Sequence, residues 1–220
     1  NMLWWKQFAN TVKLRLVVRA GGKVSFSNTN FSSDGFLAVD ALVNPGFSKT
    51  AGKISPIFPY TATNTATASS RLPSTYVVSF YDGTKLNDVK RGTVVFRNWP
   101  NPPTNQLGNE TNPTPPSSPT PNSWIKPSIN ATTGLYNTTV SGTDYGKVGI
   151  MKDYTQGVPL ITAAESYFLQ AEAVTRGYIT GDANALFNKG IEASYNYLYK
   201  DGAGVVPSTG PYSAPVADAT

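Results

Sequence analysis

A proline-rich stretch in the middle of the chain sets the strongest limit on its fold. Residues 100–127 hold nine of the 17 prolines in the 220-residue sequence. Proline lacks a backbone N–H and fixes φ, so this stretch can form neither a helix nor the interior of a sheet. Trp99 and Trp124 lie near its two edges, and large aromatic side chains are uncommon in disordered linkers. We therefore expect an ordered loop excursion held by the rest of the fold.

The clearest regular pattern lies in residues 159–202. Thr162–Glu165 has the capping-box pattern of a helix N-terminus, and Gly177 follows as the stop. Asp182 is predicted to cap a second helix that ends before Gly202. Apolar residues recur at helical spacing through both segments, and the link between them is short. This combination predicts an antiparallel helical hairpin of about the size of a tetratricopeptide repeat.

The hairpin helices are predicted over residues 162–176 and 183–200, and another helix is predicted over residues 3–20. The apolar stripe of that first helix consists of Trp5, Phe8, Ala9, Val12 and Leu16. Aromatic side chains on the helical stripes are predicted to be core residues; they are Trp5, Phe8, Tyr167, Phe168, Phe187 and Tyr195. The chain opens inside a helical pattern and closes in a loop-like segment, so we expect it to be a fragment of a longer protein.

One segment of the first half allows two interpretations. Residues 74–81 are rich in β-branched and aromatic side chains, which favours a strand. Ser74 could equally cap a short helix. The sequence leaves this choice open.

Composition excludes several kinds of chemistry. The sequence contains no Cys and no His, which rules out disulfides, thiol nucleophiles, Ser-His-Asp triads and zinc sites built on His or Cys. The net charge of +5 comes from scattered basic residues without a cluster, so a nucleic-acid partner is not expected. No apolar run approaches the ~18 residues of a transmembrane helix. Carboxylate chemistry and binding without chemistry remain.

Residues 159–198 closely resemble the SusD/RagB family of nutrient-binding outer-membrane lipoproteins. The matching positions are Ala164-Glu165, Tyr167-Phe168, Ala171-Glu172-Ala173, Arg176-Gly177, Gly181-Asp182, Leu186-Phe187 and Gly190-Ile191-Glu192-Ala193-Ser194. The opening segment also resembles the family, through Trp5, Phe8-Ala9-Asn10 and Lys13-Leu14-Arg15-Leu16. Residues 40–48 resemble the family too. Asp88 and Arg91 stand where the family usually has Asp-Pro-Arg, with Val89-Lys90 in place of the proline.

The resemblance implies a mainly α fold, in which SusD-like, tetratricopeptide-like helical hairpins carry a large loop-rich region. The whole chain would be part of one such domain. Its parts would be a scaffold helix at residues 1–22, the loop-rich region at residues 23–158, the hairpin at residues 159–202 and a further loop at residues 203–220.

The resemblance also implies a function. The protein would capture oligosaccharides or peptides at the extracellular face of the outer membrane of Bacteroidetes, for a SusC-like TonB-dependent transporter. It would touch the membrane only through a lipid anchor, whose cysteine is absent from this chain. We expect no cofactor, no metal site and no nucleic-acid partner.

Aromatic rings outside the predicted helices are the candidates for ligand binding, because the apolar face of a pyranose lies flat on such a ring. The predicted ligand-binding residues are Trp99, Trp124, Tyr145, Tyr60, Asn98 and Arg97. Tyr76, Tyr81 and Tyr136 belong to the same group of loop aromatics. Each ring could instead pin a loop onto the scaffold.

Catalysis is the weaker alternative. Glu165 and Glu172 lie on one helical face with a rise of ~10 Å between them, whereas a glycosidase needs its carboxyl groups roughly 5–9.5 Å apart across a cleft. A capping box explains Glu165, and an ion pair with Arg176 explains Glu172. We predict no catalytic residue. Two alternatives remain open, a helical-repeat scaffold that binds protein along an exposed groove and a carboxylate-based glycoside hydrolase.

Overall fold

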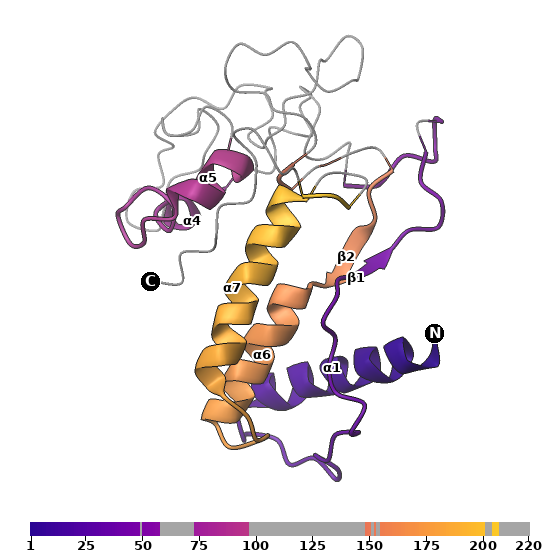
Figure 1. Cartoon of the computed structure of the whole chain (residues 1–220), viewed down its shortest axis with the longest axis vertical. Helices are drawn as coiled ribbons and strands as arrows, with labels where there is room; N and C mark the ends of the chain where they lie inside the picture. Colours follow the sequence, from indigo (N-terminus) through magenta and orange to yellow (C-terminus); the bar gives the residue numbers. More distant parts are fainter. Residues whose placement is uncertain are drawn as a thin grey trace. The chain divides into compact units, whose positions relative to one another are not determined.

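The computed structural model of the chain describes residues 1–48, 50–57, 73–96, 148–150, 152, 155–200 and 204–206. Regular structure in these residues is mainly helical (Figure 1), which confirms the predicted fold class. The elements follow in the order α1 (Met2–Ala20), β1 (Ala41–Val43), α4 (Thr75–Val78), α5 (Val89–Val95), β2 (Val158–Ile161), α6 (Ala163–Thr175) and α7 (Ala183–Tyr199). Strands β1 and β2 pair into a two-stranded sheet that the sequence did not predict.

The described residues divide into two compact units. The first contains Asn1–Val43 and Pro159–Ser194, and the second contains the described residues of Asn44–Val158 and Tyr195–Val216. The boundary between them falls inside α7. The interpretation of the whole chain as part of one domain stays a prediction.

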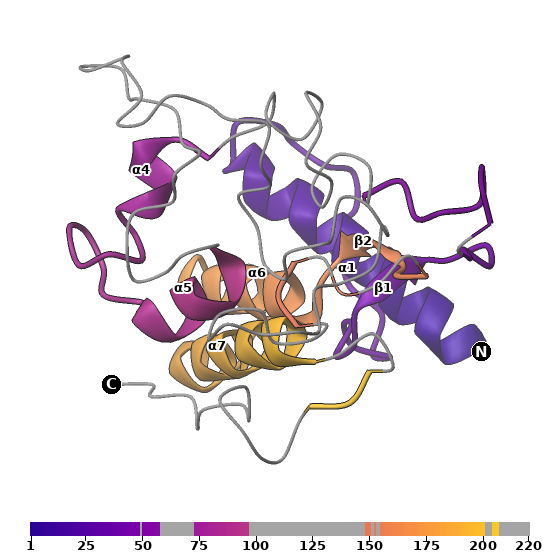
Figure 2. The ribbon, with the colours of Figure 1, turned by 90° about the horizontal axis from the view of Figure 1, so that it is seen from above.

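Helices α6 and α7 form the predicted antiparallel hairpin and lie side by side in both views (Figures 1 and 2). The hydroxyl of Thr162 accepts a hydrogen bond from the N–H of Glu165 at 3.1 Å, as expected of a cap. The C-terminal end of α6 turns at Gly177, whose φ of 73° is easily reached only without a side chain. The carboxylate of Asp182 accepts from the N–H of Ala185 at 3.0 Å and starts α7.

The two hairpin helices approach closely at Gly190. A Cβ atom added there would lie 2.7–3.0 Å from three atoms of the Phe168 ring, so a hydrogen is all that this position accommodates. Phe168 is half-buried, and its ring centroid lies 5.4 Å from that of Phe187. Phe187 itself is 52% exposed, so its prediction as a core residue was wrong.

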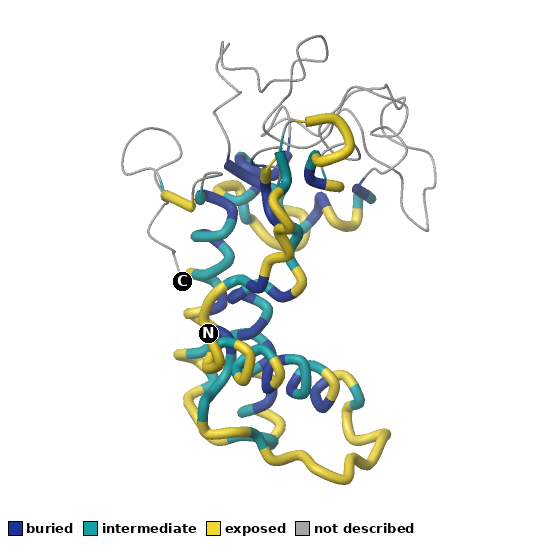
Figure 3. Tube along the Cα trace, turned by 90° about the vertical axis from the view of Figure 1, so that its right-hand side faces the viewer, coloured by how far each residue is buried: buried dark blue, intermediate teal, exposed yellow. Residues whose placement is uncertain are grey.

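The first helix was predicted correctly, but its buried face was predicted only in part. Trp5 and Leu16 of the predicted apolar stripe are 60% and 56% exposed, whereas Asn10, Thr11 and Leu14 are buried. Figure 3 shows the helix at the N-terminus with exposed, intermediate and buried stretches along it. The prediction was wrong for Trp5 and Leu16, but Phe8 and Val12 of the same stripe do pack against a core cluster.

Hydrogen bonds to the following loop explain why two polar residues are buried. The side-chain amide of Asn10 donates to the carbonyls of Ser32 at 3.0 Å and Gly35 at 2.8 Å, and its oxygen accepts from the N–H of Ser32. The hydroxyl of Thr11 accepts from the N–H of Leu37 at 3.0 Å. These side chains pair with backbone groups of the loop, among them the buried N–H of Leu37.

Two small apolar clusters form the core of the first unit. Leu14 and Val18 of α1 pack with Leu169 and Ala173 of α6. A second cluster joins β1 and β2; it contains Leu37, Ala41 and Ile161, with Trp4, Phe8 and Val12 against it. No helix in the part of the chain that the structure describes is long and apolar enough to cross a membrane.

The choice that residues 74–81 left open is settled in favour of a helix in the second unit. The hydroxyl of Ser74 accepts from the N–H of Val77 at 3.3 Å and caps α4. Asp88 caps α5 in the same way by accepting from the N–H of Arg91 at 3.2 Å. Local capping therefore prevails over the β propensity of the sequence.

We predict that Gly190→Ala destabilises the hairpin. Alanine in a helix interior is favoured over glycine by about 1 kcal/mol, but overpacking against Phe168 costs about 1–3 kcal/mol. We expect a net loss of about 1 kcal/mol in the free energy of unfolding, measured by urea denaturation.

The control is Gly190→Ala combined with Phe168→Leu, which removes the ring atoms that crowd the new methyl group. The double variant should lose less stability than the sum of the two single variants. A Gly190→Ala variant that is more stable than the parent chain would contradict the close approach.

Candidate functional site

None of the six predicted ligand-binding residues lies in the part of the chain that the structure describes. These residues are Tyr60, Arg97, Asn98, Trp99, Trp124 and Tyr145, and their role stays a prediction. Tyr136 also lies outside the described residues. Tyr76 and Tyr81, from the same group of loop aromatics, are described and can be compared.

Tyr76 is exposed on α4 and belongs to a small surface group. Its ring is 56% exposed and meets the Phe80 ring edge to face, with centroids 5.2 Å apart. The ammonium group of Lys85 lies 4.9 Å from the centroid of Tyr76 and 5.9 Å from that of Phe80. We call these three residues the Tyr76 platform.

Backbone hydrogen bonds hold the platform together. The carbonyl of Ser79 accepts from the N–H groups of Lys85 at 2.8 Å and Leu86 at 3.4 Å, which closes the turn after α4. Gly83 permits this turn with a φ of 92°. The hydroxyl of Ser79 also donates to the carbonyl of Tyr76 at 2.6 Å. Lys85 is thereby anchored next to the two rings.

Tyr81 has the opposite role. Its ring packs edge to face on the buried Phe96, with centroids 5.0 Å apart. Burial raises the pKa of Tyr81 above its ordinary value, and the nearby guanidinium of Arg91 opposes that rise. Tyr81 therefore pins its loop, whereas Tyr76 is available at the surface.

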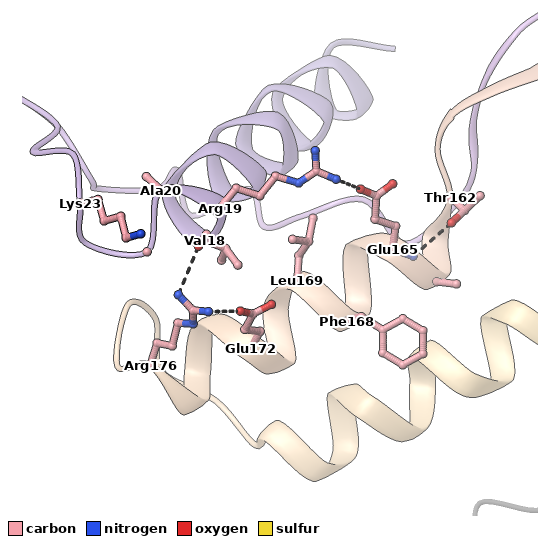
Figure 4. Close-up of a pocket in the computed structure, with 12 residues that line it drawn as sticks. Val18, Arg19, Ala20, Lys23, Thr162, Glu165, Phe168, Leu169, Glu172 and Arg176 are labelled. Carbon is pink, nitrogen blue, oxygen red and sulfur yellow. Dashed lines mark hydrogen bonds and ion pairs between the residues drawn. The ribbon is translucent and has the colours of Figure 1, made fainter. Parts of the chain in front are cut away.

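An open groove of about 670 Å³ lies in the first unit between the C-terminal end of α1 and one side of α6 (Figure 4). Apolar side chains line it together with three cationic residues, Arg19, Lys23 and Arg176, and two glutamates, Glu165 and Glu172. Figure 4 shows both glutamates pointing toward arginines.

Both glutamates are used for structural ion pairs. Glu165 lies 2.6 Å from the guanidinium of Arg15 and 3.8 Å from that of Arg19. Its carboxylate therefore completes no capping box with Thr162, so half of that prediction was wrong. Glu172 pairs with Arg176 at 2.5 Å, as predicted. Neither carboxylate needs a catalytic role to explain its position.

A buried polar network joins α5 to the C-terminal end of α7 in the second unit. The hydroxyl of Tyr195 donates to the carboxylate of Asp88 at 3.3 Å, and the guanidinium of Arg91 lies 5.1 Å from the Tyr195 ring. Asp88 also forms an ion pair with Arg91. The hydroxyl of Tyr199 donates to the carbonyl of Lys90 at 2.8 Å. The spacing of three residues lets Asp88 form this ion pair with Arg91 within one turn of α5.

Burial raises the pKa of Tyr195 to about 12, with a further contribution from the negative charge of Asp88. Burial also raises the pKa of Tyr199. Among the described residues, no group of three or more Asp or Glu side chains is placed to hold a metal ion.

Comparison with known proteins finds similarity to SusD-like proteins. Residues 126–208 match a SusD-like family model described as starch-binding and associating with the outer membrane. A SusD homologue from Bacteroides fragilis is 17% identical, with a TM-score of 0.53, over 97% of this chain and 44% of its own. Residues 126–208 are thus similar to a SusD-like family, and the fold of the chain is similar to that of a SusD homologue. No curated protein matches the chain.

A second solved structure has the same SusD-like fold. It is a Bacteroides vulgatus outer-membrane protein whose description proposes a part in nutrient binding. The identity is 16% and the TM-score 0.54, over 97% of this chain and 46% of that one. The chain thus spans less than half the length of both structures. These comparisons confirm the resemblance to the SusD-like family and the fold that it implied.

Sequence reasoning missed Lys85, the polar member of the Tyr76 platform. Tyr76 and Phe80 are four residues apart, which places them on one side of a helical turn. That spacing was a usable signal for the two rings. Lys85 comes beside them only through the turn closed at Ser79, for which the sequence offered Gly83 as its main indication.

The raised pKa of Tyr195 predicts a loss of stability at alkaline pH. The folded chain keeps this hydroxyl protonated up to about pH 12, whereas the unfolded chain releases the proton near the ordinary value of 10.0. The stabilising contribution is therefore complete below about pH 10 and is lost as the pH rises toward about 12. We expect Tyr195→Phe to show a shallower decline of the free energy of unfolding over this range, measured by urea denaturation.

Tyr76→Phe is the matched control, because it removes an exposed hydroxyl instead of a buried one. Its decline with pH should follow that of the parent chain. Identical declines for Tyr195→Phe and the parent chain would show that burial of this hydroxyl has no linkage to folding.

Proposed function

We propose that this chain is a nutrient-capture module that binds an extracellular oligosaccharide without chemical conversion. The intact protein would be lipid-anchored at the extracellular face of the outer membrane and would deliver its ligand to a SusC-like TonB-dependent transporter. The observation that carries this proposal is the match of residues 126–208 to the starch-binding, outer-membrane-associating family. The SusD-like fold supports it.

The chemistry of the chain is consistent with binding rather than catalysis. His and Cys are absent from the sequence. Glu165 and Glu172, the carboxylates of the possible glycosidase pair, form ion pairs with arginines at 2.6 Å and 2.5 Å. Glycosidases require a pair of carboxyl groups that are free to act on the glycosidic oxygen and on the sugar ring. The ion pairs of Glu165 and Glu172 support a structural role instead.

We further propose that aromatic residues outside the helices provide the sugar-stacking surface. Trp99 and Trp124 are the leading candidates for stacking, and Tyr60 and Tyr145 are further candidates. Asn98 and Arg97 would form hydrogen bonds to the sugar. Tyr76 lies on α4, but it shows that an aromatic side chain of this chain is exposed beside another ring and a cation. Peptides remain the alternative ligand of the same capture function.

The helical-repeat scaffold remains the second candidate function. The groove between α1 and α6 favours it to some degree, because it runs along a hairpin helix. Part of its lining is used in docking α1, however, through the ion pair of Glu165 with Arg15 and the hydrogen bond from Arg176 to the carbonyl of Val18. The nutrient-capture proposal therefore has the stronger support.

The test is an array of neutral and acidic oligosaccharides probed with the whole chain, followed by titration calorimetry with the best ligand. Replacing Trp99 and Trp124 together by Ala should weaken binding strongly, because each stacked ring contributes about 1–3 kcal/mol by analogy with bases stacked on aromatics. No new reducing ends should form when the ligand is incubated with the chain.

Trp5→Ala is the matched control, since it removes an exposed Trp from α1. Unchanged affinity in a folded Trp99/Trp124 variant would remove these two residues from the proposal. Absence of binding to every oligosaccharide on the array would overturn oligosaccharide capture itself.

A further inference from the structure

We propose that the Tyr76 platform binds an acidic sugar, such as a uronic acid residue, within the captured oligosaccharide. This inference rests on the proposed function and names a substrate class for it. The site consists of Tyr76 and Phe80 as the stacking surface and Lys85 as the anion-binding group. None of these three residues belongs to the ligand-binding set predicted from the sequence.

The two rings form a partly exposed apolar surface, in which Tyr76 is exposed and Phe80 is half-buried. Tyr76 is 56% exposed, and its ring meets the Phe80 ring at an interplanar angle of 76°. Edge-to-face packing of this kind holds each ring in one orientation. A pyranose can stack on the exposed Tyr76 ring while Phe80 supports that ring from the side.

The ammonium group of Lys85 is the reason for proposing an acidic ligand. Its ammonium group lies within 6 Å of both ring centroids, and no carboxylate of the described residues lies within ion-pair distance of it. The contact with the rings is weak at an exposed site, so a ligand carboxylate could readily engage the ammonium. A ligand with a negative charge next to an apolar ring face fits these groups.

The nearest acidic side chains in the sequence do not compete for Lys85. Asp82 accepts a hydrogen bond from the N–H of Thr84 at 2.9 Å and so turns to its own loop. Asp88 caps α5 and pairs with Arg91. The local cation is therefore available to an external anion, which is unusual in a turn that contains acidic residues of its own.

The platform is also held in place before a ligand arrives. The N–H of Lys85 donates to the carbonyl of Ser79, the residue next to Phe80, and the hydroxyl of Ser79 donates to the carbonyl of Tyr76. These two bonds connect the cation and the rings through one residue. Little backbone ordering is then required on binding, which favours affinity for a small ligand.

A uronic acid matches this arrangement better than a neutral sugar does. Its carboxylate sits on the pyranose ring, so a sugar that packs on Tyr76 beside Lys85 brings its charge next to the ammonium group, which lies over the Tyr76 ring. A neutral hexose would keep the stacking contact but leave the ammonium without a partner. The positive charge should therefore make the site prefer acidic sugars, whereas the rings alone would bind neutral and acidic sugars alike.

The experiment compares galacturonic acid oligomers with neutral maltooligosaccharides of the same length, titrated into the whole chain. We expect the acidic oligomer to bind more tightly, and its affinity to fall as ionic strength rises. Lys85→Gln should weaken binding of the acidic oligomer about fivefold, as for a single exposed ion pair, and leave the neutral one unchanged. Tyr76→Ala should weaken both about tenfold.

Lys53→Gln is the matched control, because Lys53 is another exposed lysine of the second unit. Equal affinity for acidic and neutral oligomers, or no effect of Lys85→Gln, would overturn this inference and leave oligosaccharide capture standing. Absence of binding to both oligomers, together with an empty array, would overturn the proposed function and this inference with it.

Discussion

The docking of α1 onto α6 is the contact on which the first unit depends. Arg15 and Glu165 are 150 residues apart in the sequence, yet they form an ion pair at 2.6 Å. At the other end of the contact, the guanidinium of Arg176 donates to the carbonyl of Val18 at 3.3 Å. Arg176 thereby satisfies a carbonyl in the last turn of α1, where the helix dipole favours a cation.

Contacts of α1 with the loop that follows it explain why the apolar pattern of α1 was misleading in part. Apolar periodicity assumes that the buried face is the most apolar one. Here Asn10 is buried because its amide holds the backbone of residues 32–35, and Trp5 is left at the surface. A helix that must organise a long loop can bury polar side chains, provided that each finds its partners. That requirement is non-local, so it leaves no period in the sequence.

Features encoded locally could be predicted, and features that depend on distant partners could not. The hairpin was predictable because Thr162, Gly177 and Asp182 act within one turn of their own position. The pairing of β1 with β2 was not, because it joins strands from opposite ends of the sequence. The same holds for the candidate site. Tyr76 could be singled out as a loop aromatic, but the position of Lys85 depends on a turn that only the structure shows.

The charged residues of the first unit also indicate where function must lie. Glu165 and Glu172 are the acidic side chains of α6, and docking to arginines occupies both. The pair of Glu165 with Arg15 joins α6 to α1, so this position is constrained by the docking of the two helices. The side chains of Tyr76, Phe80 and Lys85 in the second unit form no such ion pair with the described residues. If they bind a ligand as proposed, they can change to suit it while the ion pair of Arg15 with Glu165 keeps α1 docked on α6.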